Sequence, residues 1–199
     1  NIPAYFVGNP LTQTTKLEQT PTQLKKHYNL LGPKKIIGIL PGSRNNEIKQ
    51  LLPTMLEACN KLNKAHPELL RFVLPVASSL DKNLLQEHLN NYNFDLTIIT
   101  EDNCGVKVMA CCDSLMVASG TASLQAALLH KPMVIIYRAS TFTYFIARLV
   151  IQCAYLGLAN LLANKMIVPE LLQHNLTSEN LFFEMNRFVI EKPYTHNLV

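Results

Sequence analysis

Residues 34–44, which read KKIIGILPGSR, decide the fold of this chain. The apolar run at 36–40 stops at Pro41 and Gly42, as expected for a buried strand that enters a loop. From residue 45 to residue 63, apolar side chains recur at helical spacing, and Pro53 is expected to kink this helix or to restart it. These residues therefore predict a strand, a loop and a helix in succession.

The same alternation continues along the chain. Short apolar runs predict four further strands, at residues 71–75, 96–100, 114–118 and 133–137. Helical patterns lie between them: Asp81 can cap the first, and the next two cover residues 106–112 and 120–130. Strands that are apolar throughout and alternate with helices are typical of a parallel sheet covered on both faces. We therefore expect an α/β fold with a Rossmann-like parallel sheet and helices on both faces.

The pattern changes after this sheet. Residues 142–162 are apolar apart from Arg148 and a few polar positions, and they predict a packed helix followed by a loop. A membrane-facing surface is the alternative for this stretch. Residues 177–180, Thr-Ser-Glu-Asn, predict the start of a last helix with Ser178 as its cap.

These patterns suggest three parts: a lead-in segment at 1–33, a Rossmann-like nucleotide-binding domain at 34–165 and a C-terminal helical segment at 166–199. The sequence opens with Asn-Ile-Pro, without an initial Met, and its first residues do not have the pattern expected of a signal peptide. Residues 5–8 read as the end of a strand. We therefore expect that an N-terminal half precedes the lead-in segment.

Composition narrows the function. With 199 residues and 48% hydrophobic content, the chain can bury the core of one domain. Its net charge of +4 comes from scattered Lys and Arg, which does not favour a nucleic-acid partner. Five cysteines without Cys-x-x-Cys spacing are expected to be reduced, mostly buried thiols in a reducing compartment. The six histidines lack metal-ligand spacing, so we expect neither a metal site nor a cofactor.

The loop after the first strand has residue types suited to an anion. Parallel sheets bind ligands at the carboxyl ends of their strands. Gly42 lets the backbone turn or approach a ligand closely, Ser43 offers a hydroxyl, and the Arg44 guanidinium suits a phosphate or a carboxylate. Glu47 lies in the first helical turn, where its carboxylate can bond back to the loop. The alternative is an ordinary capped helix start with a surface arginine.

A second loop, residues 118–125 (ASGTASLQ), also joins a strand to a helix. The unpaired amides of a first helical turn make an anion site, and Ser119 and Thr121 add hydroxyls. Gln125 lies about one turn past Thr121 on the same face, within reach of a sugar hydroxyl. A simple Ser or Thr cap is again the alternative.

The two loops are more informative together than alone, because both fall at the same edge of one sheet. Neither is a Walker loop or the Gly-x-Gly-x-x-Gly fingerprint of dinucleotide-binding folds. No convincing Ser-His-Asp arrangement or facing pair of carboxylates emerges from the sequence. The loops therefore predict a phosphate-binding site, and the catalytic residues stay unassigned.

Five phrases, in this order, resemble lipid-A-disaccharide synthase, a member of glycosyltransferase family 19. They are FVGNPL at 6–11, LPGSR at 40–44 with an acidic residue three positions on, VASGTA at 117–122, KPMVIIY at 131–137, and the stretch from 159 to 173. The resemblance implies a GT-B enzyme built from two Rossmann-like halves. This chain would be mainly the C-terminal half, which holds the donor.

The resemblance implies a reaction as well. A UDP-linked 2,3-diacylglucosamine would be condensed with 2,3-diacylglucosamine 1-phosphate to lipid A disaccharide 1-phosphate, with release of UDP. No metal is implied, because helix amides and Arg44 can stabilise the leaving diphosphate. The general base is expected in the N-terminal half.

The match to the family also assigns residues. Those implied at the donor phosphates are Gly42, Ser43, Arg44, Ser119, Gly120, Thr121 and Ala122. Gln125 stands where the family usually has Glu and would contact the ribose, and Asn160 matches the family's Pro-Asn-Leu phrase, with Ala159 in place of Pro. Asn9 stands where His is common.

The implied partners are a UDP-sugar donor and an acylated sugar phosphate acceptor, in the cytoplasm. Peripheral association with the inner membrane and homodimerisation stay open. One alternative is another GT-B enzyme that uses UDP-N-acetylglucosamine, such as the lipid-linked peptidoglycan transferase or the 2-epimerase. The other alternative is a non-catalytic nucleotide-binding half-domain.

Overall fold

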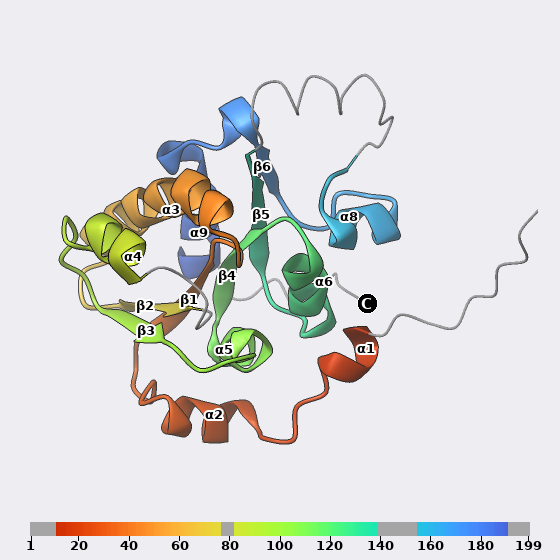
Figure 1. Ribbon diagram of the computed structural model, residues 1–199, viewed down its shortest axis with the longest axis horizontal. Helices are drawn as coiled ribbons and strands as arrows, with labels where there is room; N and C mark the ends of the chain where they lie inside the picture. Colours follow the sequence, from red (N-terminus) through yellow and green to blue (C-terminus); the bar gives the residue numbers. More distant parts are fainter. Residues whose placement is uncertain (1–10, 77–81, 139–154, 191–199) are drawn as a thin grey trace, which may run out of the picture.

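A computed structural model describes residues 11–76, 82–138 and 155–190 of the chain. Its centre is a six-stranded sheet in the order β3-β2-β1-β4-β5-β6, with every adjacent pair parallel (Figure 1). The strands are β1 (Lys35–Leu40), β2 (Leu70–Pro75), β3 (Leu96–Ile99), β4 (Ser114–Ala118), β5 (Met133–Tyr137) and β6 (Glu170–Leu172). The α/β class and the parallel sheet predicted from the sequence are thus confirmed.

Helices connect and cover these strands. They are α1 (Leu11–Thr14), α2 (Pro21–His27), α3 (Asn45–Ala65), α4 (Lys82–Leu89), α5 (Gly105–Cys111), α6 (Thr121–Leu128), α8 (Leu158–Ala163) and α9 (Ser178–Ile190), with a short 3-10 helix at Gln173–Asn175. Pro53 lies inside α3, and the helix continues past it to Ala65. The Arg138 guanidinium, just beyond β5, donates to the carbonyl oxygens of Gln50 on α3 and Leu176 before α9.

The strands bury side chains on both faces, because successive residues of a strand point to opposite sides. On one face, Ile37 and Ile39 of β1 join a core shared with α3, α4 and α9. On the other, Ile36 and Leu40 join a core shared with α2, α5, α6 and α8. Figure 1 shows these two layers of helices around the sheet. Helices on both faces, as predicted, explain why the strands read as continuous apolar runs.

Three details differ from the sequence-based expectations or go beyond them. β6 was not predicted; it pairs with β5 through Ile135 and Glu170 and two further positions. The last helix is capped by Thr177 instead of Ser178, because the Thr177 hydroxyl accepts from the Asn180 N–H at 3.1 Å. The helix predicted over 142–162 lies outside the described residues up to position 154, and α8 falls at its end.

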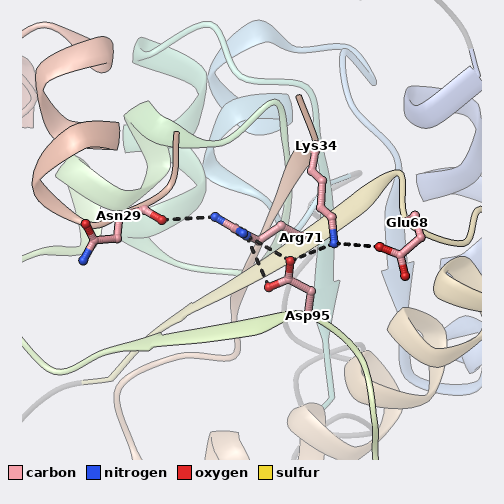
Figure 2. A network of polar contacts seen from close by, with 5 residues as sticks. All are labelled: Asn29, Lys34, Glu68, Arg71 and Asp95. Atoms are coloured by element: carbon pink, nitrogen blue, oxygen red, sulfur yellow. Dashed lines mark hydrogen bonds and ion pairs between the residues drawn. The ribbon is translucent and has the colours of Figure 1, made fainter. Parts of the chain in front are cut away.

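The amino ends of the strands are tied together by a polar network, at the edge opposite the carboxyl ends (Figure 2). Asp95, just before β3, accepts from Lys34 Nζ at 3.0 Å and from Arg71 Nε at 3.1 Å. Lys34 also pairs with Glu68 at 3.4 Å, and Arg71 donates to the Asn29 carbonyl. Burial acts to raise the pKa of Asp95, but the hydrogen bonds from Lys34 and Arg71 outweigh it and hold that pKa below its usual range.

The cysteines that the structure describes are free and buried: Cys59, Cys104, Cys111 and Cys112. Burial raises the pKa of Cys111 to about 11 and that of its neighbour Cys112 further still. These thiols therefore stay protonated at neutral pH. In the described part of the chain, no helix combines the length and the apolar character that a membrane crossing needs.

Candidate functional site

A cavity of about 490 Å³ opens at the carboxyl ends of the strands. The strand order reverses between β1 and β4, since β2 and β3 lie on one side of this pair and β5 and β6 on the other. Loops that leave adjacent strands in opposite directions form a crevice at such a switch point, and open α/β sheets bind ligands there. The loops after β1 and β4 both line this cavity.

Nine of the residues predicted for the site line the cavity: Gly42, Ser43, Arg44, Glu47, Ser119, Gly120, Thr121, Ala122 and Gln125. They come from two loops that are far apart in the sequence. The structure brings these loops together because β1 pairs with β4 in parallel, with Leu40 beside Val117. Both loops therefore start at neighbouring points of the carboxyl edge, and the helices that follow them, α3 and α6, pack on opposite faces of the sheet.

Glu47 shapes the first loop. Its Oε2 accepts from the backbone N–H groups of Ser43 at 3.0 Å and Arg44 at 3.3 Å, and its Oε1 lies 3.2 Å from Arg44 Nη1. Gly42 has a φ of +107°, and a Cβ at this position would collide with the Glu47 carboxylate. The loop thus folds tightly over one carboxylate, which needs a glycine at position 42.

Arg44 is well placed to bind an anion. Its side chain is 83% exposed, and its partner in the structure is the nearby Glu47. An exposed pair of this kind contributes little to stability, so the guanidinium can exchange this partner at small cost. Of the described residues that line the cavity, Arg44 is the one Lys or Arg.

The second loop presents the start of α6 to the same cavity. Gly120 precedes the helix with a φ of +152°, and its carbonyl accepts from the Ser123 hydroxyl at 2.7 Å. Ser119 is anchored at two points: its N–H donates to the Ile136 carbonyl at 2.8 Å, and its hydroxyl donates to the Leu156 carbonyl at 3.1 Å. Gly120, Thr121 and Ala122, at the start of α6, therefore line the cavity from a fixed loop.

A third side of the cavity was missed by the sequence-based prediction. It consists of Pro75 and Val76 at the end of β2, of Glu101, Asn103 and Cys104 after β3, and of Gly105 and Met109 on α5. The rule that selected the first two loops also applies to β3, because Glu101 follows a predicted strand. The position after a strand is the one signal here, because this loop has no glycine-rich or Ser-Gly-Thr phrase.

Glu101 is the polar centre of this third side. Its carboxylate accepts from Lys107 Nζ at 2.6 Å and from the Tyr28 hydroxyl at 3.0 Å. The hydrogen bond from Lys107, followed by that from Tyr28, lowers the pKa of Glu101 below its usual range. Burial and the nearby Glu101 together raise the pKa of Tyr28. Glu101 is thus ionised at neutral pH, and α2 and α5 hold its carboxylate in place.

Asn160, the tenth predicted site residue, does not line the cavity. It lies on α8 with a side chain that is 0% exposed. Its amide oxygen accepts from the N–H groups of Ile167 and Val168, and its amide nitrogen donates to the Val168 carbonyl and to Glu170. These four bonds use every donor and both lone pairs of the amide, so Asn160 has no position left for a ligand.

No group of three His, Cys, Asp or Glu side chains within the described ranges is arranged to hold a metal ion. The chemistry that these residues offer is that of an anion site: the Arg44 guanidinium, the start of α6, and the hydroxyls of Ser43 and Thr121.

Comparison with protein families gives a match over nearly the whole chain. The family described as Lipid-A-disaccharide synthetase matches residues 1–196. A lipid-A-disaccharide synthase from Azotobacter vinelandii is 38% identical over 181 residues, which are 91% of this chain and 48% of that protein. Lipid-A-disaccharide synthase 1 from Legionella pneumophila (strain Paris) is 37% identical over 94% of this chain and 47% of its own length. The chain thus spans about half the length of these relatives.

Solved structures with a similar fold are more distant in sequence. WaaG, a glycosyltransferase involved in lipopolysaccharide biosynthesis, superposes with a TM-score of 0.66 at 10% identity, over 96% of this chain and 47% of that one. Anabaena Alr3699/HepE in complex with UDP and glucose gives 0.57 at 15% identity, over 90% of this chain and 45% of that one. At these identities, the likeness concerns the fold.

Proposed function

Since this chain belongs to the lipid-A-disaccharide synthetase family, we propose that it forms the donor-binding half of a GT-B glycosyltransferase of lipid A biosynthesis. In the proposed reaction, UDP-2,3-diacylglucosamine and 2,3-diacylglucosamine 1-phosphate give lipid A disaccharide 1-phosphate and UDP. The observation that carries this proposal is that both predicted phosphate loops line the same cavity at the β1–β4 switch point.

In this proposal the donor diphosphate lies between the two loops. The Arg44 guanidinium turns from Glu47 to a phosphate oxygen, and the first-turn N–H groups of α6 donate from the other side. Negative charge grows on the diphosphate as the glycosidic bond to the donor breaks. Fixed donors aimed at that charge lower the barrier without an added metal. Glu47 keeps its bonds to the backbone of the first loop, so the loop keeps its shape.

The remaining space suits the rest of the nucleotide. Pro75, Val76 and Met109 give the cavity an apolar part, and Gln125 and Glu101 give it further hydrogen-bonding groups. Gln125 is our candidate for the ribose hydroxyls. The general base that activates the acceptor hydroxyl would come from another part of the full-length protein.

The proposal also includes an acylated acceptor and contact with a membrane surface. An acylated acceptor requires access to lipid, and α8 and the turn after it expose Leu162 (65%) and Met166 (63%). Exposed apolar side chains of this kind favour peripheral binding at a membrane surface. We expect the full-length protein to work at the cytoplasmic face of the inner membrane.

The test of donor binding is titration calorimetry with UDP. A charge-assisted hydrogen bond is worth about 1.5–3 kcal/mol, so Arg44→Ala should weaken UDP binding roughly tenfold to a hundredfold. Lys49→Ala is the matched control, because it removes the same charge from an exposed position of α3 that does not line the cavity. Equal UDP affinity in wild type and Arg44→Ala would refute the proposed seat for the diphosphate.

A further inference from the structure

Ser119 lines the cavity, yet its hydroxyl hydrogen is already used. Ser119 Oγ donates to the Leu156 carbonyl oxygen at 3.1 Å. A carbonyl oxygen can only accept and a hydroxyl has one hydrogen, so the direction of this bond is fixed. The Ser119 hydroxyl can therefore contact a ligand only through the lone pairs of its oxygen, Oγ. While this bond holds, Ser119 can accept a hydrogen bond but cannot donate one to a phosphate oxygen.

The Leu156 carbonyl is held in place from the far edge of the sheet. Glu170 on β6 accepts from the Leu156 N–H at 3.0 Å through Oε2 and from the Gly157 N–H at 3.0 Å through Oε1. Gly157 packs so closely that a Cβ there would collide with Ile135 and lie 3.0 Å from Glu170 Oε1. Contacts with Ile135 on β5 and Glu170 on β6 therefore fix the position of the backbone at residues 156 and 157.

Asn160 in turn fixes the Glu170 carboxylate. Its Nδ2 donates to Glu170 Oε1 at 2.8 Å, and its other hydrogen bonds go to the backbone of Ile167 and Val168. Because the amide is fully buried, the loss of any of these bonds would leave a polar group without a partner. A continuous chain of hydrogen bonds thus runs from Asn160 through Glu170 and residue 156 to Ser119.

We propose that Asn160 and Glu170 are positioning residues that make Ser119 a hydrogen-bond acceptor for a hydroxyl group of the donor. They act by holding the Leu156 carbonyl where it takes the one hydroxyl hydrogen of Ser119. This inference deepens the proposed function and rests on it, because it assumes a nucleotide-sugar in the cavity. It assigns Ser119 to a ribose or hexose hydroxyl, and it leaves the diphosphate to Arg44 and the backbone amides.

The first experiment separates a hydroxyl from a phosphate as the partner of Ser119. We expect Ser119→Ala to weaken UDP binding roughly two- to tenfold, the loss typical of one neutral hydrogen bond, if the ribose is the partner. The affinity for 2′,3′-dideoxy-UDP, which lacks the ribose hydroxyls but keeps the diphosphate, should then stay unchanged. If the hexose is the partner, the loss should appear with UDP-N-acetylglucosamine and not with UDP.

Two outcomes of this experiment would overturn the inference. One is an equal loss for UDP and its dideoxy analogue with no further loss for the sugar nucleotide, which would make Ser119 a phosphate contact. The other is no loss with any of the three ligands. If the wild-type protein binds none of these ligands, the proposed function itself fails, and this result is distinct from either of the two.

The second experiment asks whether Glu170 acts through Ser119. Glu170→Gln should weaken binding of the affected ligand two- to tenfold in the wild-type background and have no effect in the Ser119→Ala background. A merely structural role would instead give additive losses, whatever the change in melting temperature. Glu179→Gln, an exposed change on α9 away from the cavity, is the matched control. Additive losses in the double variant would rule out the positioning role.

Discussion

At Gly42 the backbone has a φ of +107°, and the Cα lies against the Glu47 carboxylate. Both features require the absence of a Cβ, one through backbone strain and the other through space. Gly105 also lines the cavity, but its surroundings are open and its φ is not positive. Two glycines of one site thus carry different constraints.

Gly42→Ala should lower the free energy of unfolding by about 1–3 kcal/mol and abolish detectable UDP binding, because the loop can no longer close over Glu47. Gly105→Ala, at the first position of α5, should leave the free energy of unfolding nearly unchanged. Urea unfolding and UDP calorimetry on both variants provide the test. Wild-type affinity in Gly42→Ala would mean that the shape of this loop does not matter for binding.

For several site residues the signal in the sequence was the residue type. Gly42, Arg44 and Ser119 were predicted because glycine, guanidinium and hydroxyl groups at strand ends favour anion binding; they line the cavity, and their roles stay predictions. Glu101 was not predicted, because its loop has no glycine-rich or Ser-Gly-Thr phrase. Asn160 was placed in the site by resemblance, but a resemblance cannot separate a residue that contacts a ligand from one that supports the fold.

At the scale of elements, the start of α9 shows how a cap is chosen. Thr177 and Ser178 can both accept a hydrogen bond from a first-turn N–H, so the sequence alone fits either one. The structure selects Thr177, whose hydroxyl accepts from the Asn180 N–H at 3.1 Å. Packing of α9 against α3 and the sheet through Leu181, Met185 and Val189 fixes the register of the helix and hence its first residue.

Thr177→Ala should therefore lower the free energy of unfolding by about 1 kcal/mol, while Ser178→Ala should leave it nearly unchanged. Thermal or urea unfolding of the two variants measures this difference directly. The reverse order of the two losses would restore Ser178 as the cap and place the start of α9 one residue later.

β6 shows what local pattern cannot supply. It has three residues, all partly buried, which is too short for a recognisable period of apolar side chains. Its identity as a strand comes from pairing with β5, a contact between distant parts of the chain. The other five strands were predictable because each carries its own apolar run, which is buried in all of them except β3, where only Ile99 is buried.

For the molecule as a whole, the amino edge of the sheet makes stability depend on pH. The pKa of Asp95 in the folded protein lies below its usual range, so the folded state favours the ionised form. Such a group contributes stability that is fully present above its unfolded pKa, about 3.9, and is lost as the pH falls through the folded pKa.

Asp95→Asn should thus lower the free energy of unfolding at about pH 7, by roughly 1 kcal/mol for a partly exposed network. The difference between wild type and variant should shrink below about pH 4, as the wild-type carboxylate becomes protonated. Urea unfolding between about pH 7 and pH 3 measures this difference in the free energy of unfolding. Glu68→Gln is the control, because the Glu68 side chain is 92% exposed. A difference that does not change with pH would mean that the ion pairs of Asp95 contribute no stability.

The order of the strands was the part of the architecture beyond reach of the sequence. The runs of apolar residues indicated a parallel sheet and placed two loops at one edge, but they did not say which strands are neighbours. That choice depends on how the helices pack over both faces, which no short window of sequence contains. The crevice between β1 and β4 is a consequence of this strand order.

The pairing of β1 with β4 also has a consequence for how the chain folds. In the sequence, β2, β3 and their helices lie between β1 and β4. These two central strands can therefore pair only after a long loop of chain has closed. Contacts between residues this far apart form slowly in two-state proteins. A refolding experiment should therefore recover most of the helical signal before the chain regains the ability to hold a nucleotide.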